Sequence, residues 1–186
     1  MKSCDWRTII DSTYPADRKV RGILLSHSAS VSALALRIAD NLGLDLDRDE
    51  IEAAAMLHDI GIIRTNAPGI DCLGEAPYLC HGAIGADMLR ECGAPETLAL
   101  VAERHTGAGL TPDEIENAGL PLPKGRSYMP ESCLERLICY ADCFYSKGGD
   151  GSKKDIERVR KSMDKFGSSV RERFERLHSE FGRGNI

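Results

Sequence analysis

Hydrophobic residues recur at helical spacing along most of the chain. Apolar positions lie three, four or seven residues apart, and no sustained run of residues alternates in the manner of a β-strand. We therefore predict an all-α fold, a compact helical bundle. The helices are expected at residues 5–11, 16–41, 47–61, 81–92, 95–105, a short stretch after residue 111, 130–145, 153–166 and 169–181.

Local signals mark where these helices begin and end. Gly43 and Gly93 follow two of the periodic runs, in the position where glycine ends a helix. Thr111 and Glu114 have the spacing of a capping box, which starts a short helix. The long helix at 16–41 either continues through Ser26 or breaks there, and the pattern leaves both alternatives open.

Two connections are unusually long. Residues 64–80 and 106–129 are rich in glycine, proline and polar side chains. Loops of this length in a compact domain are often functional lids. A surface insertion without a function is the alternative, and the sequence does not decide between them.

The whole chain has the size and composition of one globular domain. It has 186 residues, 42% hydrophobic and 28% charged. We expect a single domain over 1–186, with a central core at about 20–147 and a C-terminal helical extension at about 152–182. We expect no apolar stretch as long as a membrane helix, and Asp5 and Arg7 stand where a signal peptide would be apolar. We expect a cytoplasmic protein with no membrane partner.

Cysteine and charge patterns exclude further classes. The cysteines are odd in number and form no C-x-x-C pair, which argues against a zinc ribbon or a disulfide framework and favours free, mostly buried thiols. The net charge of -5 argues against nucleic-acid binding. The basic excess from Lys147 onward is interpreted as a solvated helical tail. The cysteines are Cys4, Cys72, Cys80, Cys92, Cys133, Cys139 and Cys143.

Four of the five histidines lie on the apolar faces of the predicted helices, because residues three, four and seven apart share a face. Asp142 lies on such a face as well, among Leu134, Ile138 and Ala141. His178 falls beside its apolar stripe and is predicted at the surface, so His178→Ala should leave activity unchanged. The inward histidines are His27, His58, His81 and His105.

This arrangement predicts a metal site. A buried, unpaired carboxylate costs more free energy than a fold can spare, and none of the apolar stripes contains lysine or arginine. Imidazole and carboxylate together suit Fe or Mn, with Co, Ni or Zn as alternatives. Asp59 follows His58 near a helix end set by Gly61, so both side chains can reach one site. Six ligands suit two metal ions that share Asp59 better than one open catalytic metal.

In this order the six residues resemble the H...HD...H...H...D pattern of the HD-domain phosphohydrolase superfamily. The resemblance covers roughly residues 20–147. Short stretches around the ligands resemble the symmetrical diadenosine tetraphosphate hydrolases, although Cys-Phe-Tyr-Ser-Lys after Asp142 departs from that branch. The chain also lacks the Gly-Tyr-Pro signature of cyclic-dinucleotide phosphodiesterases. The matching stretches are His58-Asp59-Ile60-Gly61, His81-Gly82, His105-Thr106-Gly107 and Ala141-Asp142.

The resemblance implies a two-metal hydrolase. One metal would be held by His27, His58, Asp59 and Asp142, and the second by Asp59, His81 and His105. Asp59, His81 and His105 are the expected catalytic residues. A hydroxide bridging the metals would attack the phosphorus of a phosphate ester or anhydride, which we expect to be a nucleotide.

The phosphate groups of such a substrate need cations at the rim of the site. The candidates are Lys147, Arg104, Lys124 and Arg126, although for the two in the second long loop, Lys124 and Arg126, we favour the interpretation as solvated side chains. The expected partner is a small phosphate-containing molecule, and the protein is expected to be a monomer or a homodimer.

Two alternative functions remain open. A mixed-valence di-iron oxygenase could use the same ligands, but Thr106 and Gly107 follow His105 where those oxygenases have a substrate-gripping lysine nearby. A non-catalytic sensor of nucleotide or metal is the other. We expect oxygen-independent hydrolysis.

Overall fold

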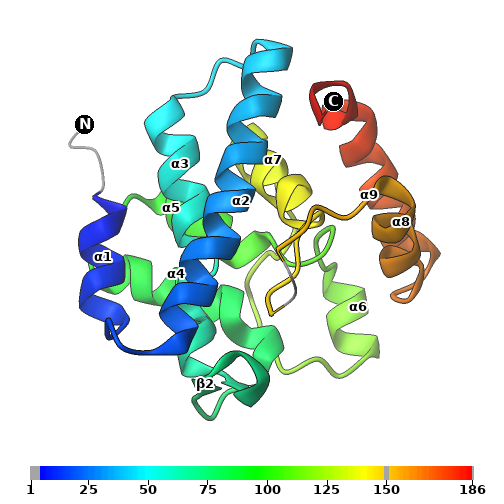
Figure 1. Cartoon of the computed structure of the whole chain (residues 1–186). Helices are drawn as coiled ribbons and strands as arrows, with labels where there is room; N and C mark the ends of the chain where they lie inside the picture. The colour runs from blue at the N-terminus through cyan, green and yellow to red at the C-terminus, as the bar shows by residue number, and fades with distance from the viewer. Residues whose placement is uncertain (1–4, 149–150, 186) are drawn as a thin grey trace.

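The computed structural model describes residues 5–148 and 151–185 and confirms the all-α prediction (Figure 1). Short 3-10 helices at Ile60–Arg64 (η1), Pro68–Ile70 (η2), Tyr78–Cys80 (η3) and Gly182–Asn185 (η4) complete the helical structure. The α-helices are α1 (Trp6–Thr13), α2 (Lys19–Leu42), α3 (Arg48–Leu57), α4 (His81–Glu91), α5 (Glu96–Arg104), α6 (Pro112–Asn117), α7 (Cys133–Asp142), α8 (Ile156–Asp164) and α9 (Ser168–Phe181).

Caps explain several of the helix boundaries. Asp47 accepts hydrogen bonds from the backbone N–H groups of Asp49 and Glu50 at the start of α3. Thr111 and Glu114 form the predicted reciprocal capping box of α6. Gly43 ends α2 with φ of 62°, a left-handed conformation that glycine adopts without strain.

Helix α2 runs unbroken through Ser26 and crosses the middle of the molecule (Figure 1). It packs against α3, α7 and η4. By length and hydropathy (mean 1.4) this helix could span a membrane, so the expectation that no stretch approaches that length is wrong. Its valine, isoleucine, leucine and alanine residues, interrupted by few charged ones, give it this hydropathy. Half of the apolar window is buried inside the fold, the burial expected of a core helix.

The first long connection contains a minimal β-hairpin. Strand β1 (Asn66–Ala67) pairs antiparallel with β2 (Cys72–Leu73), and Asn66 lies opposite Leu73. Two-residue strands carry no detectable alternation, so the sequence pattern could not predict them. The hairpin packs against η1, the segment that follows His58 and Asp59.

The C-terminal helices α8 and α9 belong to the main hydrophobic core, on the side of the molecule opposite α1 (Figure 1). Val159 and Phe174 are fully buried there. The six described cysteines are free, and four of them are buried; Cys4 lies outside the described residues.

His178 of α9 is a correction to the sequence analysis. It is partly buried rather than a surface residue. Its Nδ1 lies 2.8 Å from the hydroxyl of Tyr140, and its ring stacks on Phe174 with centroids 6.1 Å apart. The helical wheel placed it beside the apolar stripe of α9, but α7 covers that side of the helix.

Candidate metal centre

Five elements bring the six predicted ligands together. His27 lies in the middle of α2, where it is buried. The others stand at helix ends, where neighbouring residues can reach one site: His58 and His105 cap the C-termini of α3 and α5, His81 begins α4, and Asp142 ends α7. Asp59 follows His58 directly and is fully buried.

One group of donor atoms surrounds the Oδ2 oxygen of Asp59. Nε2 of His27 lies 3.2 Å from this oxygen and 2.9 Å from Oδ1 of Asp142. Nε2 of His58 lies 3.1 Å from the same Asp59 oxygen and 3.5 Å from Oδ1 of Asp142. These are the four residues that the family resemblance assigns to one metal.

A second group surrounds the other oxygen of Asp59. The Nε2 atoms of His81 and His105 each lie 3.4 Å from Oδ1 of Asp59 and 3.0 Å from one another. The carboxylate of Asp59 therefore faces both groups, one with each oxygen. This arrangement suits a carboxylate that bridges two cations.

The hydrogen bonds of the histidines show that the site fits a metal. Nδ1 of His58, His81 and His105 donates to the carbonyls of Ala55, Tyr78 and Ala102, at 2.6, 2.7 and 2.8 Å. In the neutral imidazole this leaves Nε2 as a lone-pair donor aimed into the site. Nε2 of His81 and His105 would then repel each other unless a cation or proton lies between them.

Unsatisfied polar atoms lead to the same conclusion. Among the described residues, His27, His58, Asp59 and Asp142 have buried atoms without a well-formed hydrogen bond. Such atoms are rare in folded proteins, and a cation would satisfy them. Imidazole nitrogens and carboxylate oxygens are the donors of first-row transition metals, so this His/Asp cluster is compatible with divalent metal binding.

Protonation states favour cation binding as well. Burial raises the pKa values of Asp59 and Asp142, but the neighbouring cationic groups outweigh it and hold both pKa values well below the usual range. Burial lowers the pKa of His81 to about 3, which keeps its imidazole neutral at physiological pH. The site therefore offers ionised carboxylates and at least one neutral imidazole, the forms that coordinate a metal.

Lys147 is the one predicted substrate-binding residue that enters the site. It follows α7, and its Nζ lies 2.7 Å from Oδ2 of Asp59. Burial lowers its pKa, but the carboxylates of Asp59 and Asp142 outweigh burial and raise the pKa above its ordinary value. A buried aspartate of the cluster therefore has a lysine partner in reach, although none of the apolar stripes contains lysine or arginine. Lys147 escaped the helical-stripe search because it lies beyond the helix.

Glycines allow the ligand-bearing segments to approach one another. A Cβ atom on Gly61 would lie 2.2 Å from the carbonyl oxygen of His81, and one on Gly82 would lie 2.7 Å from that of Ala102. These contacts are shorter than any real Cβ contact, so only glycine fits. Gly61 thus lets the His58-Asp59 segment pack directly on the start of α4, which carries His81.

The cluster opens into a cavity of about 670 Å³, which is within the usual range of small-molecule sites. Fully buried Asp59 lies behind the wall, whereas Asp142 is 17% exposed and lines the cavity. Both long connections contribute to the wall, including Tyr78 from the first and Thr106 from the second.

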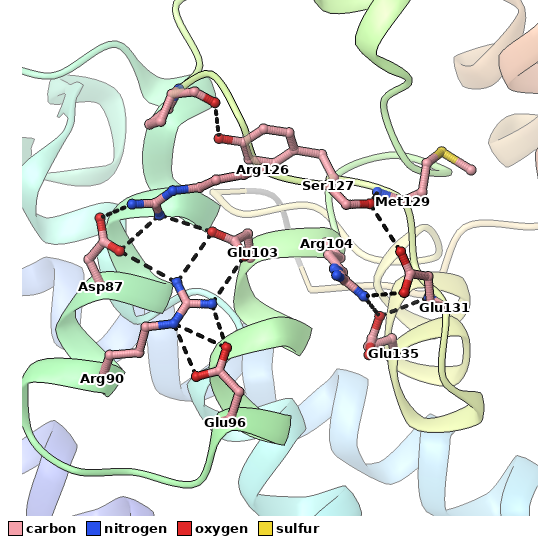
Figure 2. Close-up of polar contacts among 12 residues, drawn as sticks. Asp87, Arg90, Glu96, Glu103, Arg104, Arg126, Ser127, Met129, Glu131 and Glu135 are labelled. Carbon is pink, nitrogen blue, oxygen red and sulfur yellow. Dashed lines mark hydrogen bonds and ion pairs between the residues drawn. The ribbon is translucent and has the colours of Figure 1, made fainter.

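The remaining predicted substrate-binding residues lie outside the cavity lining. Arg104 pairs with Glu131 and Glu135, at 3.1 and 3.0 Å (Figure 2). Arg126 pairs with Asp87 and Glu103, at 2.8 and 2.9 Å, in the same figure. Both guanidinium groups therefore have carboxylate partners. Arg104 joins α5 to the start of α7, and Arg126 fastens the second long connection to α4 and α5.

Lys124 is exposed in that connection and does not line the cavity. Sequence proximity to His105 suggested Arg104 as a phosphate ligand, but its side chain lies on a different face of α5.

Sequence reasoning missed several residues of the cavity wall, among them Tyr78 and Lys154. Tyr78 stacks on His81, with ring centroids 4.9 Å apart, and its ring lies 6.0 Å from Nζ of Lys147. Lys154 lines the cavity, and its Nζ donates to the carbonyls of Cys143 and Tyr145 at 3.3 and 3.1 Å. It lies in the segment interpreted as a solvated tail, and no sequence signal distinguished it from the other lysines there.

Three sequence relatives match this chain, and the chain spans only part of the length of each. An uncharacterised protein of Methanocaldococcus jannaschii is 39% identical over 122 residues, which cover 64% of each chain. Two proteins named tRNA (cytidine(56)-2'-O)-methyltransferase are similar as well. The one from Picrophilus torridus is 31% identical over 85% of this chain, and that from Thermoplasma volcanium is 33% identical over 83%. This chain spans only 41% and 40% of their lengths.

Solved structures share the fold. The HD domain of the phosphodiesterase PgpH from L. monocytogenes matches with a TM-score of 0.61 and 15% identity, over 98% of this chain and 94% of that one. The same domain in complex with cyclic-di-AMP matches with a TM-score of 0.52 and 16% identity, over 87% and 80%. At this identity the likeness concerns the fold alone.

The family comparison agrees with the residue pattern. The model of the HD domain family matches residues 24–146, more than half of the chain, and this range includes all six predicted ligands. The chain therefore belongs to the HD-domain family.

Proposed function

We propose that this protein is a metal-dependent phosphohydrolase that cleaves a phosphate ester or anhydride of a nucleotide. The observation that carries the proposal is the convergence of six His and Asp side chains, several with unsatisfied polar atoms, beside a ligand-sized cavity that His81, His105 and Asp142 line. Phosphoryl chemistry needs metal cations and a positively charged contact near the reacting group, and Lys147 supplies the second.

The chain's own residues would divide the work as follows. His27, His58, Asp59 and Asp142 would hold one divalent metal, and Asp59, His81 and His105 the other. Bound metals of this kind lower the pKa of water and neutralise charge on phosphoryl oxygens. Lys147 would bind a phosphate oxygen and orient the ester. Tyr78 would hold the ring of His81 by stacking.

The names of the two longer relatives describe methyl transfer to tRNA. We infer that this activity resides in the part of those proteins that the present chain does not match. The described residues contain only two strands of two residues each, with no parallel sheet on which an α/β nucleotide-cofactor site could be built. The matched part carries the His and Asp ligands instead.

The test begins with protein purified without added metal. Elemental analysis should find Fe, Mn or another first-row metal, and the absence of bound metal even after reconstitution would contradict the proposal. Hydrolysis is then measured with and without oxygen. Release of inorganic phosphate reports on mononucleotides and phosphonates, and chromatography of the released nucleotides reports on dinucleoside polyphosphates, cyclic dinucleotides and single-stranded RNA. Diadenosine tetraphosphate is the first anhydride to try, because the motifs resemble its hydrolases.

We expect release without oxygen. Turnover that requires oxygen would instead identify the oxygenase, and tight nucleotide binding without turnover would identify a sensor. Asp59→Asn should remove both metal and activity while circular dichroism stays unchanged. Asp45→Asn, the same substitution at an exposed site, is the matched control and should change neither.

A further inference from the structure

The lining of the cavity at the metal centre combines two groups of residues that differ in chemistry and in the elements they come from, and we call them its reactive end and its apolar end. His81, His105, Asp142 and Lys147 form the reactive end. The other end comes from α8, α9 and the second long connection and is almost entirely apolar. Its residues are Leu110, Leu120, Met163, Phe166 and Val170.

Phe166 stands out at this apolar end. Its side chain is 70% exposed, and among the described residues only Leu73, at 67%, is a comparably exposed large hydrophobic side chain. A single exposed apolar residue is ordinary on a protein surface. Phe166 differs from Leu73 because it lies on the wall of the cavity that contains the reactive end, whereas Leu73 lies on a separate hollow.

The position of Phe166 is fixed by the fold around it. It follows α8, and its backbone N–H donates to the carbonyl of Met163 at 2.9 Å. Gly167, with φ of 107°, then turns the chain into α9. Met163 lines the same cavity, is only 5% exposed and has a side chain of adaptable shape, so it can form an apolar base behind Phe166.

A molecule that fills the whole cavity must therefore combine an anionic group at one end with an apolar group at the other. An exposed aromatic ring favours a planar partner, because aromatic rings stack on one another. Ser162 and Lys154 line the same cavity and offer polar contacts for hydroxyl groups. A nucleoside phosphate has these three parts in one molecule.

We propose that Phe166, supported by Met163, is the platform on which the base of the substrate stacks, and that it selects nucleoside phosphates over small phosphate esters. This assignment rests on the proposed phosphohydrolase function. It names a specificity residue outside the His and Asp cluster and outside the region matched by the family model.

The test compares two ligands that differ only in the base. The probes are the phosphonate analogues of adenosine 5′-monophosphate and ribose 5-phosphate, in which a CH2 group replaces the ester oxygen so that no turnover occurs. Binding is measured by calorimetry on metal-loaded protein. Phe166→Ala should weaken binding of the adenosine analogue by roughly 5- to 150-fold, the range expected for loss of one base stack. The ribose analogue should change less than about twofold, and Phe166→Tyr should restore binding of the adenosine analogue.

Leu73→Ala is the matched control, because it removes the other exposed apolar side chain and should affect neither ligand. Equal effects of Phe166→Ala on both probes, or no effect on either, would overturn the platform. Conversion of a dimer to a monomer by Phe166→Ala, with unchanged affinity for both probes, would show that Phe166 is an interface residue and also overturn it. If binding depends on the base but the protein hydrolyses none of the tested substrates, the proposed hydrolase function fails while the stacking platform stands.

Discussion

Lys147 and Asp59 form a buried ion pair inside the candidate metal centre. The ammonium group lies 2.7 Å from the carboxylate, and the Asp59 side chain has no exposed surface. Removing one partner of a buried pair leaves the other charge uncompensated, at a cost of about 3–5 kcal/mol. The lysine therefore stabilises the metal-free protein, in which the carboxylates have no metal partner.

Lys147→Met should thus lower the melting temperature of the metal-free protein by roughly 10 °C, since about 1 kcal/mol corresponds to 2–4 °C at this chain length. Addition of metal should raise the melting temperature of the variant more than that of the wild type, because the cation replaces the lost ammonium. Differential scanning fluorimetry with chelator and with metal measures both values. Lys124→Met, at an exposed lysine, is the control, and an equal metal-induced rise in Lys147→Met and wild type would contradict the role of Lys147.

Substitution of His178 should change the stability of the protein without changing its activity. Its hydrogen bond to Tyr140 and its stacking on Phe174 hold α9 against α7, away from the metal ligands. His178→Ala should lower the free energy of unfolding by about 1–2 kcal/mol and leave metal content and turnover unchanged. Chemical denaturation and elemental analysis check the two halves of this prediction. Loss of metal from a folded variant would contradict it.

At the residue scale the sequence predicted which His and Asp side chains converge, and it missed much of the cavity. Helical periodicity places side chains on a common inward face, which is how His27 and His105 were found. Lys154 and Phe166 lie near helix ends in a charged segment, where periodicity carries no information about a neighbouring cavity. Their position depends on how α8 packs against the rest of the fold.

At the scale of elements, the metal centre depends on the close approach of η1 to α4. Gly61 sits at that contact and has no room for a side chain. The sequence indicated Gly61 only as a helix end. The contact that makes glycine necessary joins segments about twenty residues apart, and no local pattern contains it.

Gly61→Ala should therefore destabilise the protein by about 3 kcal/mol or more, because the added Cβ would force η1 away from α4. It should also weaken metal binding, since Asp59 and His81 would move apart. Gly22→Ala is the matched control. Nothing lies within 4 Å of its Cβ, and at this exposed position of α2 alanine should stabilise the protein by roughly 0.8–1 kcal/mol. Thermal and chemical denaturation compare the two, and a neutral Gly61→Ala would contradict this account.

At the scale of the whole molecule, a polar link joins the cavity wall to the C-terminal helix. Glu114 of α6 accepts from Arg173 of α9 at 2.8 Å and from the hydroxyl of Ser169 at 2.8 Å. Arg173 also donates to the carbonyls of Ala108 and Gly109, at 3.2 and 3.0 Å. The wall segment that follows His105 is thus fixed by a residue more than sixty positions later.

This link should make stability depend on pH in acid. Burial raises the pKa of Glu114, but hydrogen bonds from Thr111, Ser169 and Arg173 outweigh burial and lower the pKa to about 2 from 4.5. Because the pKa of Glu114 is lower in the folded state than in the unfolded state, its carboxylate stabilises the folded protein above about pH 4.5. This contribution disappears as the pH falls towards 2. Glu114→Gln should cost about 2 kcal/mol at pH 7.

The difference in free energy of unfolding between wild type and Glu114→Gln should shrink as the pH falls from about 5 to about 2. Urea denaturation across this range measures it. Glu116→Gln, on the exposed side of the same helix, is the control. A difference that stays constant with pH would show that the carboxylate charge contributes nothing.

The two ends of the cavity are encoded by separate stretches of the chain. The His and Asp ligands lie within residues 24–146, the range of the family model, whereas Met163, Phe166 and Val170 lie beyond it. Substitutions in α8 and α9 can therefore alter which molecule is accepted while the reacting groups stay untouched. Within such a family, a new substrate specificity can evolve by replacement of the helical hairpin that corresponds to α8 and α9. Relatives with identical His and Asp residues therefore need not share a substrate.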